Sequence, residues 1–193
     1  VQELGKLHPN VLQETNERRE QQMGSYGDPP DILDGVVETM LSQNTTSANS
    51  TRAFANLKKA FPKWDQVVTL NAPTQLEEAI HCGGLAKIKA ERIMNICQTL
   101  QDERGSPSLE YLRDWSIPQI QKELMRFKGL GNKTVSCVLL FTLGREEFPV
   151  DTHVYRISKQ LNWIPESYSR DKAYDYLNAK VPPPLKLDLH CLL

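Results

Sequence analysis

Residues 127–141 read FKGLGNKTVSCVLLF, and this stretch decides how the middle of the chain folds. Gly129 and Gly131 flank Leu130, and Lys133 follows where an apolar-periodic helix begins. A helical apolar stripe also precedes the glycines, so the pattern predicts a helix, a tight turn and a second helix. Glycine suits this turn because it tolerates positive φ and allows another backbone to approach closely.

A turn of this kind exposes successive backbone N–H groups at a helix N-terminus, which is a ready site for a phosphate oxygen. It predicts sequence-independent binding of the DNA backbone through main-chain groups. Lys133, taken alone, has two interpretations: a contact to phosphate or a nucleophile. The turn by itself therefore favours DNA binding and leaves catalysis open.

Helical apolar spacing continues through most of the chain. Stripes that predict helices lie at residues 32–41, 53–61, 88–100 and 117–127. Thr74 with Glu77 predicts a capping box at a helix start. No segment alternates with period two between hairpin turns, so the predicted fold class is all-α.

The composition limits the choice of function. The chain has 193 residues, of which 39% are apolar, enough for one large domain or two small lobes with a real core. The net charge of -1 gives no global sign of a nucleic-acid-binding protein, so any DNA contact must come from local patches. The four scattered cysteines form no CxxC pair, which argues against a structural zinc site and a disulfide framework.

Other sequence features bear on the compartment and on the extent of the chain. The cysteine pattern predicts a reducing, intracellular compartment. There is no apolar run of transmembrane length and no charged-then-apolar leader. Because the sequence starts at Val1 and ends in LHCLL, we expect it to be part of a longer protein. The breakers GSYGDPP, residues 24–30, and VPPP, residues 181–184, predict linkers.

The segment LMRFKGLGNKTVSCVL, together with FPVDTHVYRI at 148–157, resembles the endonuclease III branch of the helix-hairpin-helix DNA glycosylases. Two upstream segments are similar to the same family in the same order: LSQNTTSANS at 41–50 and CGGLAKIKAERI at 82–93. The resemblance extends over residues 31–193. One departure is Lys128, where the family usually has proline, and we expect it to alter the rigidity of the hairpin rather than the chemistry.

The resemblance implies that Lys133 is the nucleophile and Asp151 the catalytic carboxylate. Such a carboxylate stabilises positive charge at the sugar C1′ carbon, and the amine then forms a Schiff base that permits β-elimination. Desolvation beside Val135 and Leu139, with the helix dipole, is expected to favour the neutral amine. We expect the lysine to lose its proton during the reaction, to the carboxylate or to the leaving base. Asp151 is also interpreted as the N-cap of the helix starting at Thr152, and one carboxylate can serve both roles.

A glycosylase must extrude its target nucleotide and fill the gap. The resemblance implies that Gln43 inserts toward the orphaned base and Leu85 wedges the opposite strand. Without the resemblance, Gln43 is equally a polar helix-terminal residue and Leu85 a core residue. The nearby lysines and Arg92 are interpreted as phosphate contacts or as a solvated helix face. The predicted DNA-contacting set is Gln43, Asn44, Leu85, Lys87, Lys89, Gly129, Leu130, Gly131, Asn132 and Thr134.

The resemblance also implies an architecture and a cofactor. It predicts an all-α, two-lobed glycosylase fold with a central cleft, in which residues 32–146 form a helical barrel lobe containing the hairpin. Residues 1–31 and 147–193 form the second lobe. Many family members hold a 4Fe-4S cluster through four cysteines. Cys191 precedes the first ligand position, so a cluster requires a chain that continues past Leu193, and no metal or cofactor is expected within these residues.

Three functions remain open from the sequence. The first is a bifunctional glycosylase and AP lyase that removes damaged or modified pyrimidines. The second is a glycosylase for 5-methylcytosine, mismatched thymine or an oxidised purine, and the third is a non-catalytic hairpin module that binds DNA. The expected partner is duplex DNA with a flipped-out nucleotide, with no membrane involved. We expect a monomer, located in the nucleus or the mitochondrion if the source is a eukaryote.

Overall fold

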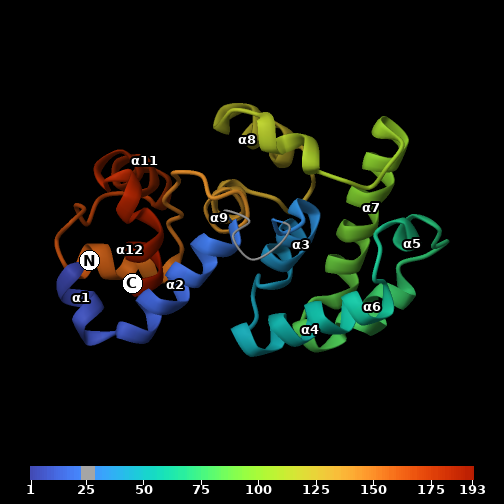
Figure 1. The fold of residues 1–193 in the computed structure, drawn as a ribbon, viewed down its shortest axis with the longest axis horizontal. Helices are drawn as coiled ribbons and strands as arrows, with labels where there is room; N and C mark the ends of the chain where they lie inside the picture. Colours follow the sequence, from blue (N-terminus) through green and yellow to red (C-terminus); the bar gives the residue numbers. More distant parts are fainter. Residues whose placement is uncertain (23–28) are drawn as a thin grey trace. The chain divides into compact units, whose positions relative to one another are not determined.

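A computed structural model describes residues 1–22 and 29–193 of the chain. These residues form α-helices and short 3-10 helices joined by loops, with no β-strand in the described ranges (Figure 1). The predicted all-α class is confirmed. No helix of the described ranges has the length and apolar character needed to cross a membrane. The linker predicted at 24–30 lies, up to residue 28, outside the described part.

The chain divides into two compact units. The continuous unit comprises residues 31–131, and the split unit joins residues 1–30 with residues 132–193. The glycine turn therefore belongs to the continuous unit, whereas α9 (Asn132–Phe141), which carries Lys133, belongs to the split unit. The lobe boundary expected after residue 146 would place α9 with the barrel lobe, and that lobe assignment stays a prediction.

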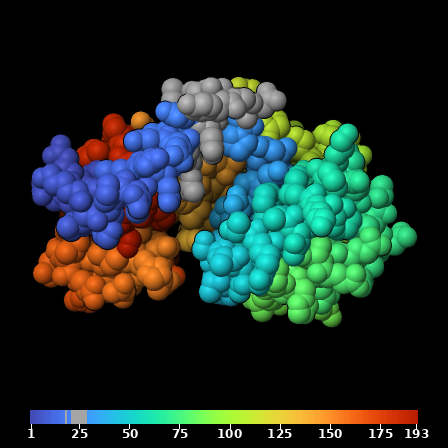
Figure 2. Space-filling model, turned by 60° about the horizontal axis from the view of Figure 1, so that its bottom comes forward, coloured from blue at the N-terminus to red at the C-terminus, as the bar shows by residue number. Residues whose placement is uncertain are grey.

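The continuous unit is built from helices around an apolar core. Its elements are α3 (Ile32–Leu41), α4 (Ser47–Ala60), α5 (Asp65–Val68), α6 (Thr74–Ile80), η1 (His81–Gly83), α7 (Ala86–Arg104), η2 (Glu110–Asp114) and α8 (Ile117–Met125). The apolar stripe predicted over residues 32–41 is fully buried. Figure 2 shows α4 to α7, in cyan to green, as one continuous mass.

Asp34 joins three of these helices through its side chain. Its Oδ1 accepts hydrogen bonds from Lys58 Nζ at 2.8 Å and from Trp64 Nε1 at 2.7 Å. Lys58 lies on α4, and Trp64 directly precedes α5. Hydrogen bonds to an ionised carboxylate are stronger than neutral ones, so this residue fixes α4 and the start of α5 against α3.

Two details of this unit differ from the sequence predictions. The predicted capping box at Thr74 is absent: Pro73 occupies the N-cap position and no side-chain cap bond forms. Thr74 is already helical, so its hydroxyl is one position too late to cap. Ile88, expected in a buried stripe, is 45% exposed, whereas Ile93 on the same helix is 0% exposed. The first turn of α7 therefore presents an apolar side chain to solvent.

The split unit brings both ends of the chain onto one core. Its elements are α1 (Gln2–Leu7), α2 (Pro9–Gln22), α9, α10 (Thr152–Gln160), α11 (Arg170–Lys180), η3 (Pro183–Leu185) and α12 (Lys186–Leu192). Val1, Leu4 and Leu193 pack against a buried cluster that includes Phe148 and Val154. Within VPPP, Val181 is the C-cap of α11, and Pro183 and Pro184 begin η3, which leads directly into α12. The segment therefore joins two helices of one unit and is not a linker as predicted.

The two turn glycines have different surroundings. Gly129 has φ +97, and a Cβ there would lie 2.7 Å from Arg92 Cδ. A Cβ on Gly131 would meet no atom within 4 Å. Between them Leu130 is 3% exposed, so its side chain anchors the turn. The protein itself requires glycine at Gly129, whereas the space beside Gly131 is open.

The variant G129A is expected to lower the free energy of unfolding by about 1–3 kcal/mol, because it adds a backbone strain and a clash with Arg92. G131A should cost less, about 1 kcal/mol or under, since only the residue before α9 changes. Urea denaturation of both variants measures the difference. Equal losses would contradict the distinction drawn between the two glycines.

Candidate active site

Lys133 is the second residue of α9 and is exposed, whereas residues 134–140 of that helix are buried. Val135 and Leu139 are almost completely buried, at 1% and 0% exposure. They therefore face the core and do not surround the lysine. The desolvation of Lys133 by these two residues, expected from the sequence, is absent, while the position near a helix N-terminus is as predicted.

Cys137 lies one helical turn after Lys133 and is 5% exposed. Burial raises the pKa of the Cys137 thiol, and the charge of Lys133 and a hydrogen bond with its side chain oppose this rise. The negative charge of Asp151 raises the same pKa further. Cys137 thus interacts with both residues of the predicted catalytic pair, which places the lysine and the carboxylate in one neighbourhood of the split unit.

Asp151 is the N-cap of α10, as predicted. Its Oδ1 accepts a hydrogen bond from the Val154 amide at 2.8 Å, and its backbone is extended, with φ -82 and ψ -172. The residue is half-buried. The cap bond fixes the carboxylate orientation while Oδ2 forms no hydrogen bond within the described residues. This arrangement allows one carboxylate to start a helix and still face a ligand.

The chain just before Asp151 is held by contacts from α11 and α12. The Phe148 amide donates to Asn178 Oδ1 on α11 at 2.9 Å. His190 Nδ1 on α12 lies 3.0 Å from the Pro149 carbonyl oxygen. Phe148 itself is fully buried in the core of the split unit. The backbone leading to the carboxylate therefore has little freedom to move.

Glu147, which is 2% exposed, lies within a buried polar network. Its carboxylate accepts hydrogen bonds from the Tyr174 hydroxyl and from Asn178 Nδ2, the second at 3.2 Å. Lys186 Nζ donates to Asn178 Oδ1 at 2.7 Å and to the Glu146 carbonyl at 2.8 Å. Burial lowers the pKa of Lys186, and the charge of Glu147 opposes this. Breaking a buried, paired network is costly, so it further immobilises the segment before Asp151.

Apart from the two lysines on α7, the predicted DNA-contacting residues of the continuous unit lie on three loops. Gln43 Nε2 donates to the Gly129 carbonyl oxygen at 3.1 Å, which joins the first loop to the hairpin turn. Asn44 and Leu85 both have left-handed backbones, with φ 53 and φ 52. Leu85 is 52% exposed, so the core interpretation of this leucine is wrong and its side chain is available to a ligand.

The predicted lysines on α7 divide into two kinds. Lys87 is exposed, as a phosphate contact requires. Lys89 is only 2% exposed, and its Nζ donates to the carbonyl oxygens of Leu41 at 2.8 Å and Gly83 at 2.9 Å. A buried ammonium bonded to two carbonyls does not reach a phosphate, so the structure corrects the DNA-contact prediction for Lys89.

In the hairpin, the side chains of Leu130 and Thr134 are buried, at 3% and 5% exposure. Any contact that these two residues make with a ligand must use main-chain atoms. Gly131 and Asn132 are exposed at the start of α9. The first N–H groups of a helix lack intrahelical acceptors, so this end of α9 can bind an anion.

Sequence reasoning missed two features of the site. Cys137 follows Lys133 by four positions, a spacing that places both on one helix face and could have been noticed. Glu147 is an acidic residue beside Phe148, and nothing in the local pattern indicates that it is buried. Its partners are Ser136 of α9, whose hydroxyl lies 3.4 Å from the carboxylate, and Tyr174 and Asn178 of α11, so the network depends on long-range packing.

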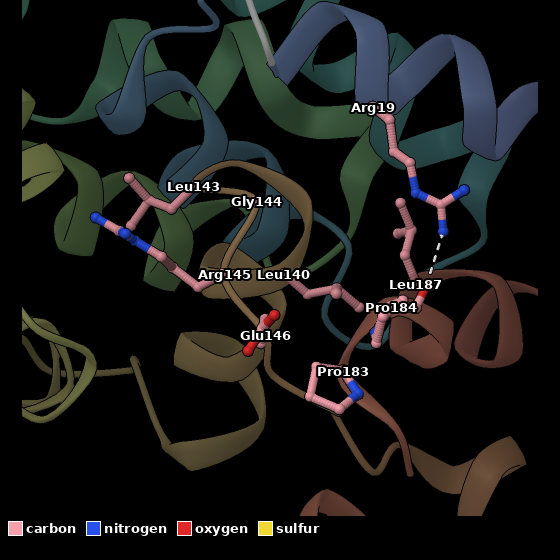
Figure 3. Close-up of a pocket in the computed structure, with 9 residues that line it drawn as sticks. All are labelled: Arg19, Leu140, Leu143, Gly144, Arg145, Glu146, Pro183, Pro184 and Leu187. Carbon is pink, nitrogen blue, oxygen red and sulfur yellow. Dashed lines mark hydrogen bonds between the residues drawn. The ribbon is translucent and has the colours of Figure 1, made fainter.

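A separate pocket lies in the split unit near the end of α9 that is far from Lys133 (Figure 3). Apolar Leu140 and Leu187 line it together with charged Arg19 and Glu146. Arg19 forms an ion pair with Asp188 at 2.7 Å and donates to the Pro184 carbonyl at 3.3 Å. None of the predicted site residues lines this pocket.

Within residues 1–22 and 29–193, no group of three or more His, Cys, Asp or Glu side chains is arranged to hold a metal ion. Cys97 and Cys137 are buried in different units, and Cys191 lies on α12. These residues do not fit the four-cysteine ligand set of a 4Fe-4S cluster. No step of the chemistry considered below passes through such a cluster.

Comparisons with known proteins identify the family of the chain. The family model of the HhH-GPD superfamily base excision DNA repair proteins matches residues 37–183. "Putative DNA glycosylase At3g47830" of Arabidopsis thaliana is 56% identical over 163 residues, which are 84% of this chain and 55% of that protein. "DNA glycosylase/AP lyase ROS1" of the same plant is 42% identical over 91 residues, or 47% of this chain and 6% of ROS1.

A solved structure, a non-covalent endonuclease III–DNA complex, has the same fold. It matches with a TM-score of 0.72 at 23% identity, over 94% of this chain and 83% of that chain. The expected glycosylase fold and the resemblance to endonuclease III are confirmed. The chain spans 55% of the length of At3g47830, so the matched region is one part of that longer relative. The chain belongs to the HhH-GPD superfamily of base excision DNA repair proteins.

Proposed function

We propose that this chain is a DNA glycosylase with AP lyase activity, and that Lys133 and Asp151 carry out the chemistry. The observation that supports it most directly is that the charges of both Lys133 and Asp151 act on the pKa of the buried Cys137 thiol, as expected if the lysine and the capped carboxylate lie near each other. The similarity to ROS1, whose name describes a DNA glycosylase/AP lyase, supports the combination of the two activities.

The proposed reaction uses both residues in sequence. Lys133 Nζ attacks C1′ of the extruded nucleotide, the bond from C1′ to the base breaks, and the base leaves with the bonding electrons. The lysine proton passes to Asp151 or to the departing base. Asp151 stabilises the positive charge that develops at the sugar. The C1′–O4′ bond of the resulting aminal then breaks, O4′ takes up a proton, and the nitrogen forms the Schiff base with C1′. The Schiff base acidifies the C2′ proton, and removal of that proton expels the 3′ phosphate by β-elimination.

The proposed substrate is duplex DNA that carries a damaged or modified pyrimidine. Resemblance to endonuclease III favours this class. The panel that tests it includes duplexes with thymine glycol, 5-methylcytosine, a mismatched thymine and 8-oxoguanine, each scored for base release. Preferential release of an oxidised purine would overturn the pyrimidine assignment without affecting the assignment of the lysine.

DNA approaches Lys133 through the hairpin in this proposal. The exposed Gly131 and Asn132 offer main-chain N–H groups to a phosphate, and Leu85 is exposed as a wedge requires. Lys133 is exposed in the free protein, so the bound nucleotide would supply the apolar cover that the protein alone does not. A water-excluded site would then form only in the complex.

The variant K133A should form no covalent adduct when borohydride is added to the protein with abasic-site duplex DNA. Without the amine no Schiff base can form, so there is no imine to reduce. K128A is the matched control, since it removes another exposed lysine of the same hairpin and should retain the adduct. Trapping of K133A at the wild-type level would contradict the proposal that Lys133 forms the Schiff base of the lyase reaction.

The variant D151N should slow base release by about 10²–10⁴-fold, because the carboxylate charge and its basicity are lost. Asparagine also caps helices, so the free energy of unfolding should change little. D31N is the control: Asp31 caps α3 of the continuous unit through a bond to the Asp34 amide and has no assigned role in the proposed chemistry. Single-turnover base release with thymine-glycol duplex measures the effect, and equal rates for D151N and wild type would refute the assigned role.

The variant G131A should weaken binding of duplex DNA about tenfold, because a methyl group would separate the phosphate from the main-chain N–H groups. No protein atom lies near that position, so folding should be almost unaffected. Fluorescence anisotropy with a labelled abasic-analogue duplex measures the affinity. Unchanged affinity would mean that the backbone of the DNA does not approach this glycine.

A further inference from the structure

Lys89 is among the largest fully buried side chains of the described residues, although it ends in an ammonium group. Its Nζ donates one hydrogen bond to the Leu41 carbonyl oxygen at 2.8 Å and another to the Gly83 carbonyl oxygen at 2.9 Å. All three residues belong to the continuous unit. One side chain therefore joins the end of α3 to the end of η1.

Each of these carbonyls stands just before a predicted DNA-contacting residue. Leu41 ends α3, and the chain continues to Gln43 two residues later. Gly83 ends η1, and the chain continues to Leu85 two residues later. The last carbonyls of a helix have no intrahelical partner, so the ammonium satisfies acceptors that would otherwise be buried and unpaired. It also sets the spacing between the two loops.

The loops that follow have strained backbones and need such support. Asn44 has φ 53 and Leu85 has φ 52, in the left-handed region that leucine rarely adopts and asparagine tolerates better. Gly84, between Gly83 and Leu85, has φ 68. A strained conformation persists only where the surroundings determine it. Here the bond from Lys89 to Gly83 fixes the chain directly before the strained pair.

A second contact holds the Gln43 loop from its other side. Gln43 Nε2 donates to the Gly129 carbonyl oxygen at 3.1 Å. The loop is thus held between the hairpin turn and the Lys89 ammonium. Leu85 is 52% exposed, so the loop that carries it is fixed while its side chain remains free of the core.

Burying an ammonium group has a desolvation cost that an apolar side chain of the same size does not have. Burial lowers the pKa of Lys89, which reflects the cost of removing its charge from water. Methionine has nearly the same length and would be buried without this cost, but it would leave the Leu41 and Gly83 carbonyls without a donor. The lysine is therefore suited to fixing these two carbonyls rather than to packing alone.

We propose that Lys89 is a positioning residue that holds Gln43 and Leu85 at the spacing needed to fill the gap left by an extruded nucleotide. This inference rests on the proposed function, since it assumes that the two residues enter duplex DNA. Lys89 touches neither the DNA nor the reacting atoms. Its effect passes through the loops that begin at Leu41 and Gly83.

The test uses a duplex with 2-aminopurine opposite a tetrahydrofuran abasic analogue, because 2-aminopurine fluorescence rises when the orphaned base loses stacking. The wild type should raise the fluorescence on binding, and L85A should lose most of this rise. In K89M the fluorescence rise should be at least about fivefold smaller than in the wild type, because the two hydrogen bonds that fix the loops are removed. K122M, which alters an exposed lysine on α8, should behave as wild type.

The double variant K89M/L85A separates positioning from general stability. If Lys89 acts through Leu85, adding K89M to L85A changes the fluorescence no further, whereas independent effects would add. Borohydride trapping on a pre-formed abasic site should stay within about twofold of wild type for K89M, because no target base has to be extruded from the duplex there. A general loss of structure would lower both signals together.

A full fluorescence rise for K89M, or additive losses in the double variant, would overturn the proposal. If K89M does not fold, K89R takes its place, because it keeps the charge and the donors but changes their geometry. K89R should fold and give a reduced rise, and a wild-type rise would equally overturn the proposal. Failure of the proposed function is separable: the wild type would then form no borohydride adduct, and the fluorescence assay, which requires no catalysis, would still report on the loops.

Discussion

The hydrogen bond between the Asp151 carboxylate and the Val154 amide is the contact around which the candidate site is organised. It begins α10 and at the same time directs a half-buried carboxylate. Such a group is useful only if its backbone does not move, and the contacts of Phe148 and Pro149 with α11 and α12 provide that. The buried Glu147 network reinforces the same segment from behind. The same short stretch of chain, residues 147–154, therefore both starts α10 and holds the carboxylate proposed for catalysis.

The lack of net positive charge is consistent with a DNA-binding protein of this design. A chain with a net charge of -1 cannot rely on a broad basic surface to hold a polyanion. Main-chain N–H groups at a helix start, such as those proposed to bind phosphate at α9, act through geometry and require no excess of lysine or arginine. The open space at Gly131 fits this mode, and the buried Lys89 shows that even a lysine near the proposed interface can serve the protein rather than the DNA.

The fold was predictable where apolar spacing is long and regular. The stripe at 32–41 is buried in full, and Asp151 caps its helix as its position suggested. Short-range patterns failed where the outcome depends on distant partners. From the sequence alone Lys89 is expected at the surface, because its contact with the distant Leu41 carbonyl is not visible in the local pattern. Ile88 fits the apolar stripe of α7, but its side chain lies outside the core. Apolar periodicity identifies which face of a helix is apolar, but it does not show where along the helix that face leaves the core.

The order of the two units along the chain has a kinetic consequence. The continuous unit, residues 31–131, contains all its own contacts in one uninterrupted stretch, so it can fold while synthesis of the remaining chain proceeds. The core that supports Asp151 includes Val154 and is covered by Val1, Leu4 and Leu193, so it cannot close until the C-terminal helix has emerged from the ribosome. The loops that carry Gln43 and Leu85 would thus mature before the carboxylate is in place, whereas the start of α9 would mature together with it. On the nascent chain, the residues proposed to fill the gap in the duplex would be positioned before the proposed chemistry is possible.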